Sequence, residues 1–171
     1  MKDNIILIGM MGAGKSTIGV ELHKALPNFK IVDIDEEIEK KENKKISDIF
    51  KDFGEHYFRE LETKLIEDIC KYDKQIIATG GGIFEKDLNQ KILKDNGQVF
   101  YLKASPETLY ARIKNQTHRP LLKQGFGIEN IKTILEQREH NYAKAHTIID
   151  TENKPIYNIV EEIRKKRICN E

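Results

Sequence analysis

The fold is decided by the stretch Gly9-Met10-Met11-Gly12-Ala13-Gly14-Lys15-Ser16, which follows the short apolar run Ile5–Ile8 and leads into a helix-like segment. A strand, a glycine-rich loop of the form GxxxxGK[ST] and a helix together make up a phosphate-binding loop. Glycines let successive backbone N–H groups turn toward one anion, and the helix N-terminus adds partial positive charge. A chance turn between strand and helix is the alternative, but the flanking elements favour nucleotide binding.

The residue types in this loop predict individual roles. Lys15 is long enough to reach the β- and γ-phosphates, and the Ser16 hydroxyl is suited to Mg²⁺. We therefore expect ATP and Mg²⁺ as cofactors, with ATP held by Gly12, Ala13, Gly14, Lys15, Ser16 and Thr17.

The composition predicts an ordinary globular chain. It has 171 residues, of which 39% are hydrophobic and 33% charged, with a formal net charge of +1. We expect one domain over residues 1–171, and no partner among nucleic acids or membranes. No secretory signal is visible, and Cys70 and Cys169 lack a metal-ligand spacing, so we expect reduced thiols in a cytoplasmic protein.

Short apolar runs alternate with helical patterns along the chain. This alternation predicts the α/β class, with a parallel sheet covered by helices on both faces and ligands at the carboxyl ends of the strands. The expected strands are Ile5–Ile8, Ile31–Asp33, Gln75–Ala78, Val99–Leu102 and Thr147–Ile149. The expected helices lie near residues 15–26, 35–45, 47–53, 55–72, 85–95, 105–115, 128–145 and 155–167.

Two acidic residues close the second predicted strand. If the strand continues through Asp33-Ile34-Asp35, both carboxylates leave it on the same side. One of them could help to hold Mg²⁺ through water, and the other could orient an attacking hydroxyl or accept its proton. The alternative is that both only cap the following helix.

Two further segments contain residues suited to binding an anion. Arg59 and Glu62 are three residues apart and share a helix face, either as an exposed ion pair or as a guanidinium held to grip a planar anion. The triplet Gly80-Gly81-Gly82 follows the third strand, where glycines suit close approach of a ligand, with a flexible hinge as the alternative.

A polar loop separates two predicted helices farther along the chain. Residues 115–127 hold few core-forming side chains, so we expect a functional or disordered segment. Arg119 is well placed to close over the transferred phosphate as part of a lid. Arg138 lies on the helix that follows and carries no signal by itself.

Taken together, these motifs and a few further positions extend over nearly the whole chain. They are residues 9–17, Asp33-x-Asp35, Ile49-Phe50, Gly54-Glu55-x-x-Phe58-Arg59-x-x-Glu62, Gly80-Gly81-Gly82, Val99-Phe100-Tyr101-Leu102, Arg119-Pro120-Leu121-Leu122, Arg138 and Tyr142. This set resembles the shikimate kinase family of P-loop kinases. The FRxxE segment, the triple glycine and the RPLL segment are much more specific than the phosphate-binding loop alone.

The resemblance implies a three-layer P-loop fold with strand order 2-3-1-4-5, a shikimate-binding segment near residues 33–62 and a mobile lid near 113–127. It implies transfer of the γ-phosphoryl group of ATP to the 3-hydroxyl of shikimate, a step of chorismate and aromatic amino acid biosynthesis, by a monomer. Asp35, Lys15 and Arg119 would be catalytic, and Ser16 and Asp33 would hold Mg²⁺. Shikimate would contact Asp35, Arg59, Gly80, Gly81, Gly82 and Arg138, while ATP would also contact Arg112, Arg119 and Lys154.

Two alternatives remain open from the sequence. A gluconate kinase would share the fold and the loop but should lack the pairing of FRxxE with RPLL. A nucleotide-binding switch of the GTPase type should carry an Asn-Lys-x-Asp motif. Asn153-Lys154-Pro155-Ile156 lacks the required aspartate.

Overall fold

The computed structural model describes residues 2–114 and 126–167. The strands are β1 (Ile5–Ile8), β2 (Lys30–Asp33), β3 (Gln75–Ala78), β4 (Gln98–Lys103) and β5 (Thr147–Asp150). The helices are α1 (Lys15–Ala25), α2 (Ile34–Glu42), α3 (Ile46–Ile69), the 3₁₀ helix η1 (Ile83–Glu85), α4 (Asp87–Asn96), α5 (Pro106–Ile113), α6 (Ile128–Tyr142) and α7 (Ile156–Lys166). In these two ranges no helix is long and apolar enough to cross a bilayer.

The strands form one parallel sheet in the order β2-β3-β1-β4-β5, which confirms the expected order. Strand β1 lies at the centre, where Ile6 is level with Ile77 of β3 and Val99 of β4. All four β1 side chains are fully buried. The loop after β1 therefore opens at the middle of the carboxyl edge of the sheet, where ligands bind in open parallel sheets.

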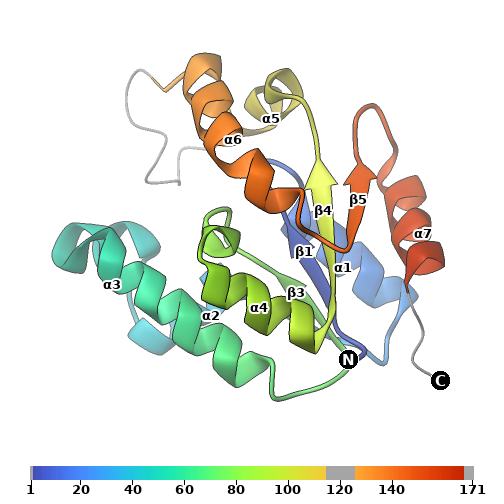
Figure 1. Ribbon diagram of the computed structural model, residues 1–171, viewed down its shortest axis with the longest axis horizontal. Helices are drawn as coiled ribbons and strands as arrows, with labels where there is room; N and C mark the ends of the chain where they lie inside the picture. Colours follow the sequence, from blue (N-terminus) through green and yellow to red (C-terminus); the bar gives the residue numbers. More distant parts are fainter. Residues whose placement is uncertain (1, 115–125, 168–171) are drawn as a thin grey trace.

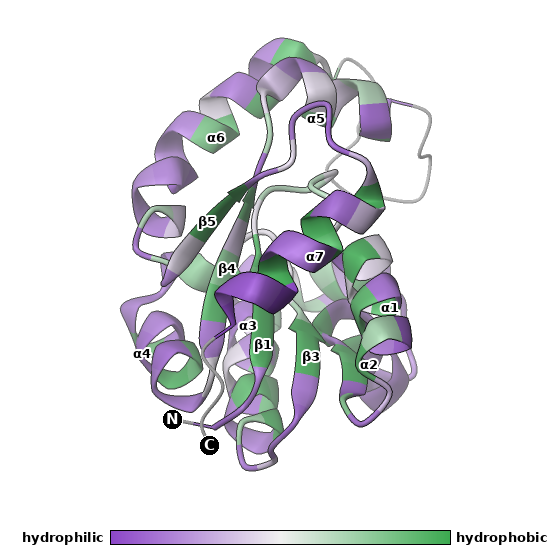
Figure 2. Ribbon diagram, turned by 90° about the vertical axis from the view of Figure 1, so that its right-hand side faces the viewer, coloured by the Kyte–Doolittle hydropathy of each residue, from purple (hydrophilic) through white to green (hydrophobic). Residues whose placement is uncertain are grey.

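Helices cover both faces of the sheet and make a three-layer arrangement. Helices α1 and α7 pack against each other on one face, and α3 and α4 pack against each other on the opposite face (Figure 1). In Figure 2 the strands are largely hydrophobic, whereas the helices combine hydrophobic and hydrophilic residues. This distribution is expected where strands are buried on both sides and helices face solvent.

The helices expected at residues 35–45 and 128–145 end three residues earlier in the structure, at Glu42 and Tyr142, and two further differences lie close to the site. The helices expected at residues 47–53 and 55–72 are the two parts of α3, and Gly54 breaks the helical backbone between them with φ of 82° and ψ of 173°. Strand β2 ends at Asp33, and α2 begins at Ile34. The expectation that Asp35 leaves the strand beside Asp33 is wrong, because Asp35 lies in the first turn of a helix.

Candidate active site

The phosphate-binding loop joins β1 to α1. Gly12 and Gly14 adopt φ values of 81° and 89°, a left-handed conformation that side chains disfavour. The Lys15 side chain folds back over the loop, and its Nζ donates to the carbonyl oxygens of Gly9 at 2.8 Å and Met10 at 2.9 Å. An ammonium group is thereby held against the loop that the sequence predicts to bind phosphate.

Asp33 caps the helix that follows it and also contacts the phosphate-binding loop. Its Oδ1 accepts hydrogen bonds from the backbone N–H groups of Asp35 at 3.0 Å and Glu36 at 3.4 Å, so it caps α2. Its Oδ2 accepts from the Ser16 hydroxyl at 2.6 Å. A carboxylate and a hydroxyl beside a phosphate-binding loop form an oxygen donor set that fits Mg²⁺.

A cavity of about 360 Å³ opens at the carboxyl edge of the sheet beside this loop. Most of the predicted ligand-binding residues line it together, although they come from separate parts of the chain. They are Gly12, Ala13, Gly14, Lys15, Ser16, Thr17, Asp33, Asp35, Gly80, Gly81, Arg112 and Lys154. Asp35 reaches this cavity from α2 rather than from β2, so the position was predicted although its local structure was not.

Arg112 and Lys154 also line the cavity. Arg112 Nη1 donates to the carbonyl oxygen of Gly12 at 3.3 Å, which places α5 against the loop. Lys154 Nζ forms an ion pair with Glu162 at 2.9 Å. Ile156 and Ile159 line the same cavity and were not predicted. Their spacing on α7 puts them on one face of the helix, which was the available sequence signal.

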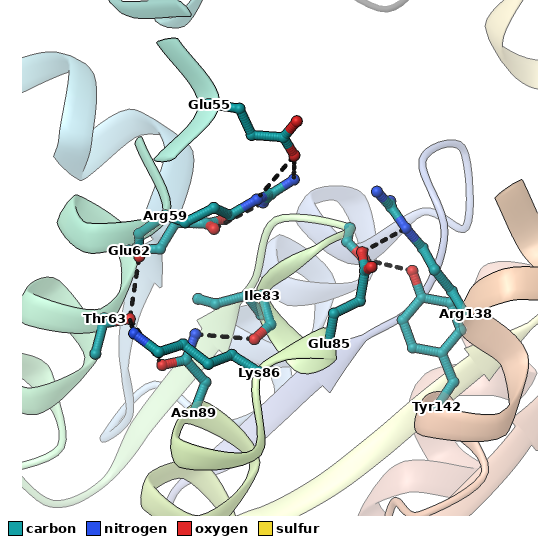
Figure 3. A network of polar contacts seen from close by, with 11 residues as sticks. Glu55, Arg59, Glu62, Thr63, Ile83, Glu85, Lys86, Asn89, Arg138 and Tyr142 are labelled. Atoms are coloured by element: carbon teal, nitrogen blue, oxygen red, sulfur yellow. Dashed lines mark hydrogen bonds and ion pairs between the residues drawn. The ribbon is translucent and has the colours of Figure 1, made fainter. Parts of the chain in front are cut away.

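Arg59 and Glu62 meet on α3, as the spacing predicts. Arg59 Nη1 lies 2.7 Å from Glu62 Oε2, and its Nη2 lies 3.0 Å from Oε1 of Glu55 (Figure 3). The alternative of an exposed pair is wrong, because the Glu62 side chain is 0% exposed. Burial raises the pKa of Glu62 to about 7, against the opposing effect of the Arg59 charge and hydrogen bond.

The glycine triplet gives charged side chains room to approach. A Cβ atom on Gly82 would lie 2.5 Å from Nη2 of Arg59, and one on Gly80 would lie 2.8 Å from Oε1 of Glu62. A Cβ atom on Gly81 would lie 3.4 Å from Nη1 of Arg138. Close approach to the triplet was predicted, and the groups that approach it in the structure belong to the protein itself.

Arg138 joins this cluster from α6. Its Nε lies 2.6 Å from Oε1 of Glu85, and its side chain is 12% exposed. Tyr142 lies one turn farther along α6, and its hydroxyl donates to the carbonyl oxygen of Gly81. Sequence reasoning missed Glu85, because an acidic residue in a short 3₁₀ turn shows no pattern that points to α6.

Arg59, Gly82 and Arg138 stand beside the cavity rather than among the residues that line it. The predicted lid arginine, Arg119, lies outside the described residues, as does most of the predicted lid segment. The site therefore has two described parts, a phosphate-binding cavity and a cluster of paired arginines, which meet at Gly80 and Gly81.

A parallel sheet of this order, with a phosphate-binding loop after β1 and a second charged cluster at the same edge, is the architecture of the P-loop class of nucleotide-binding proteins. The chain belongs to the shikimate kinase family, whose family model matches residues 11–167. It is 46% identical over 160 residues to a shikimate kinase of Persephonella marina, covering 94% of this chain and 96% of that protein.

A solved structure agrees with this assignment. The chain superposes on shikimate kinase from Acinetobacter baumannii in complex with shikimate with a TM-score of 0.91 and 32% identity, covering 96% of this chain and 92% of that one. A gluconokinase from Sinorhizobium meliloti gives a TM-score of 0.60 and 17% identity, over 95% of this chain and 89% of that one. That second likeness shows the fold alone, so the findings favour shikimate kinase over the gluconate kinase alternative.

Proposed function

We propose that this chain transfers the γ-phosphoryl group of ATP to the 3-hydroxyl of shikimate, giving shikimate 3-phosphate and ADP. The observation that carries the proposal is the meeting of two paired arginines with a phosphate-binding cavity at the triplet Gly80-Gly81-Gly82. A hydroxylated carboxylic acid needs cationic forks for its carboxylate and a carboxylate acceptor for its hydroxyls. Arg59, Arg138 and Asp35 supply these groups.

The donor half of the reaction belongs to the phosphate-binding loop. The backbone N–H groups of residues 12–17 and the Lys15 ammonium hold the phosphates of ATP, with Lys15 exchanging its carbonyl partners for phosphate oxygens. Ser16, with Asp33 acting through water, would hold Mg²⁺, which neutralises charge on the phosphate oxygens when it is bound. Arg112 and Lys154 lie where the nucleotide would extend toward α7.

The acceptor half depends on positioning. Asp35 lies at the cavity wall within reach of a hydroxyl aimed at the γ-phosphate, where it orients that hydroxyl or accepts its proton. Arg59 and Arg138 hold the carboxylate at the other end of the acceptor, together with the backbone of Gly81. Arg119 would close over the phosphates from the lid and exclude water.

The reaction would serve chorismate and aromatic amino acid biosynthesis. We propose that the chain acts as a monomer in the cytoplasm, with ATP and shikimate as its partners and with no nucleic acid or membrane partner. The near-neutral formal charge of +1 supports the last point alone, because it provides no broad field that would attract nucleic acid or an anionic membrane.

A coupled assay of ADP release with MgATP tests the proposed function. The rate is compared with shikimate, quinate, gluconate and no acceptor. We expect a clear preference for shikimate and little ADP release without an acceptor. Equal ADP release in the absence of any acceptor would exclude a kinase, and a preference for gluconate would move the chain to the alternative function.

A further inference from the structure

Glu85 holds Arg138 by one nitrogen. It is the last residue of η1, three positions beyond Gly82, and its Oε1 lies 2.6 Å from Nε of Arg138 (Figure 3). A guanidinium has N–H donors on three nitrogens, so a contact at Nε leaves the two terminal nitrogens for another partner. Glu85 therefore holds Arg138 at Nε, and a bidentate contact with a carboxylate can be made by the two terminal nitrogens Nη1 and Nη2.

The terminal end of Arg138 faces the glycine triplet. Its Nη1 lies 3.4 Å from the position that a Cβ atom on Gly81 would occupy, and Gly81 lines the phosphate-binding cavity. The same helix is tied to the same glycine by the Tyr142 hydroxyl, which donates to the Gly81 carbonyl oxygen. Helix α6 and the triplet thus keep a fixed relationship, within which only the Arg138 side chain needs to be oriented.

Arg59 shows a related arrangement on the other side of the triplet. Its Nε and Nη2 contact Glu55 at 3.3 and 3.0 Å, and its Nη1 contacts the buried Glu62. Both arginines are thus held by acidic residues that flank the triplet. The difference is that Arg138 has a single ion-pair partner among the described residues, Glu85, with the neutral Tyr142 hydroxyl as a further hydrogen-bond partner, so one carboxylate supplies the charged contact that orients it.

We propose that Glu85 is a positioning residue for the acceptor, which fixes Arg138 through Nε so that its terminal nitrogens present a two-pronged grip to the carboxylate of the substrate. This inference rests on the proposed function, in which Arg138 binds that carboxylate. It assigns to η1 the task of orienting a residue 53 positions away in sequence. An arginine freed at Nε would lose orientational order before binding, and the acceptor would bind less tightly.

The test compares Glu85→Ala and Glu85→Gln with Asp87→Ala. Asp87 is 93% exposed and lies 4.0 Å from Lys144, so its loss removes a nearby negative charge without touching Arg138. Glu85 is 43% exposed, and its truncation leaves no buried cavity. We expect Glu85→Ala to raise the KM for shikimate roughly tenfold, as for a lost hydrogen bond to a charged group, with kcat and the KM for ATP nearly unchanged.

The glutamine variant separates orientation from charge. Its amide oxygen still accepts from Nε, so we expect Glu85→Gln to restore most of the shikimate affinity, and Asp87→Ala to behave as the unaltered protein. Methyl shikimate, which lacks the carboxylate charge, should inhibit the unaltered protein and Glu85→Ala equally. This equality is the readout that general damage to the fold would not give.

Several outcomes would overturn the inference. They are an unchanged KM for shikimate in Glu85→Ala, a lowered KM that would make Glu85 a competitor of the substrate, and a glutamine variant as impaired as the alanine variant. Failure of the proposed function itself looks different. In that case the unaltered protein would not phosphorylate shikimate, whatever residue stands at position 85.

Discussion

Ser16 Oγ donates to Oδ2 of Asp33 at 2.6 Å, and this bond joins the first turn of α1 to the carboxyl end of β2. The other oxygen of the same carboxylate caps α2 by accepting from the N–H groups of Asp35 and Glu36. One side chain thus links the proposed Mg²⁺ position to the helix that carries Asp35. Two substitutions at Asp33 separate these roles.

We expect Asp33→Asn to keep the cap and lose the charge, because asparagine is as good an N-cap as aspartate. Asp33→Ala should lose both, with a fall of about 1 kcal/mol in the free energy of unfolding. Both variants should need several-fold more Mg²⁺ for half-maximal activity. Urea unfolding and a magnesium titration measure the two effects, and a normal magnesium requirement in Asp33→Asn would remove Asp33 from the metal site.

Gly82→Ala should act on the arginine beside it and leave the backbone unstrained. Gly82 has φ of −99° and ψ of −3°, which any residue adopts, but the new Cβ would lie 2.5 Å from Arg59 Nη2. The flexible guanidinium must move, so we expect the KM for shikimate to rise roughly tenfold, with the KM for ATP nearly unchanged.

The control for Gly82→Ala is Gly19→Ala in α1. There the added Cβ would make ordinary contacts, the shortest at 3.5 Å to Ile31, and alanine favours a helix. We expect full activity and unchanged or slightly higher stability in the control. Equal shikimate kinetics in the two variants would show that Arg59 does not bind the acceptor.

Glu62 makes stability fall as the pH rises from acid to neutral. Burial raises its pKa from 4.5 to about 7, so between these values the folded chain binds more protons than the unfolded chain. The stabilising contribution is therefore fully present below pH 4.5 and is lost as the pH rises through about 7.

Glu62→Gln removes this titration. We expect the free energy of unfolding to decline less between pH 5 and pH 8 in the variant than in the unaltered protein, by on the order of 2–3 kcal/mol. Urea unfolding at both pH values measures the difference. Glu60→Gln, on the exposed part of the same helix, is the control, and parallel pH profiles for Glu62→Gln and the unaltered protein would contradict the prediction.

His146 has the opposite effect on the pH dependence of stability, because it makes stability fall as the pH is lowered. Its Nδ1 accepts from the backbone N–H of Val99 at 3.0 Å, and burial, with a smaller effect of Lys94, lowers its pKa below 6.5. Its stabilising contribution is present above pH 6.5 and is lost as the pH falls through the lowered value.

We expect His146→Asn, which keeps an acceptor without titrating, to reduce the loss of stability on acidification. Thermal unfolding between pH 7.5 and pH 5 measures this change. His56→Asn provides the control, because the His56 side chain is 92% exposed. An equal or steeper acid loss in His146→Asn would show that protonation of His146 does not reduce stability in acid.

Local patterns predicted most of the fold. The apolar runs located all five strands to within one residue at each end. The three inner strands β1, β3 and β4 are buried on both faces and therefore read as unbroken apolar runs, whereas the edge strands β2 and β5 are partly exposed. The expected strand ended at Asp33, as β2 does, but the expectation that Asp35 leaves the strand on the same side as Asp33 was wrong, because a helix begins directly after Asp33. Asp33 is the N-cap of α2, and Asp35 lies in the first turn of that helix.

The phosphate-binding residues could be predicted because a local motif defines them. The side-chain pairs could not be predicted as fully, because they depend on how distant elements pack against each other. Residues 12–17 follow from their spacing alone. The burial of Glu62 depends on how α3 packs against α4 and η1, and the contact of Glu85 with Arg138 depends on where α6 packs against η1. The hydrophobic periodicity of the sequence predicts neither of these packing contacts.

The break in α3 implies an unusual pattern of mutational tolerance. A Cβ atom at position 54 would meet nothing within 4 Å, so no neighbour crowds the start of a side chain there. The backbone alone, with φ of 82° and ψ of 173°, excludes other residues. In a screen of all substitutions at position 54, alanine and tryptophan should therefore be almost equally harmful. Every side chain should reduce stability there, and the loss should not grow with the size of the side chain.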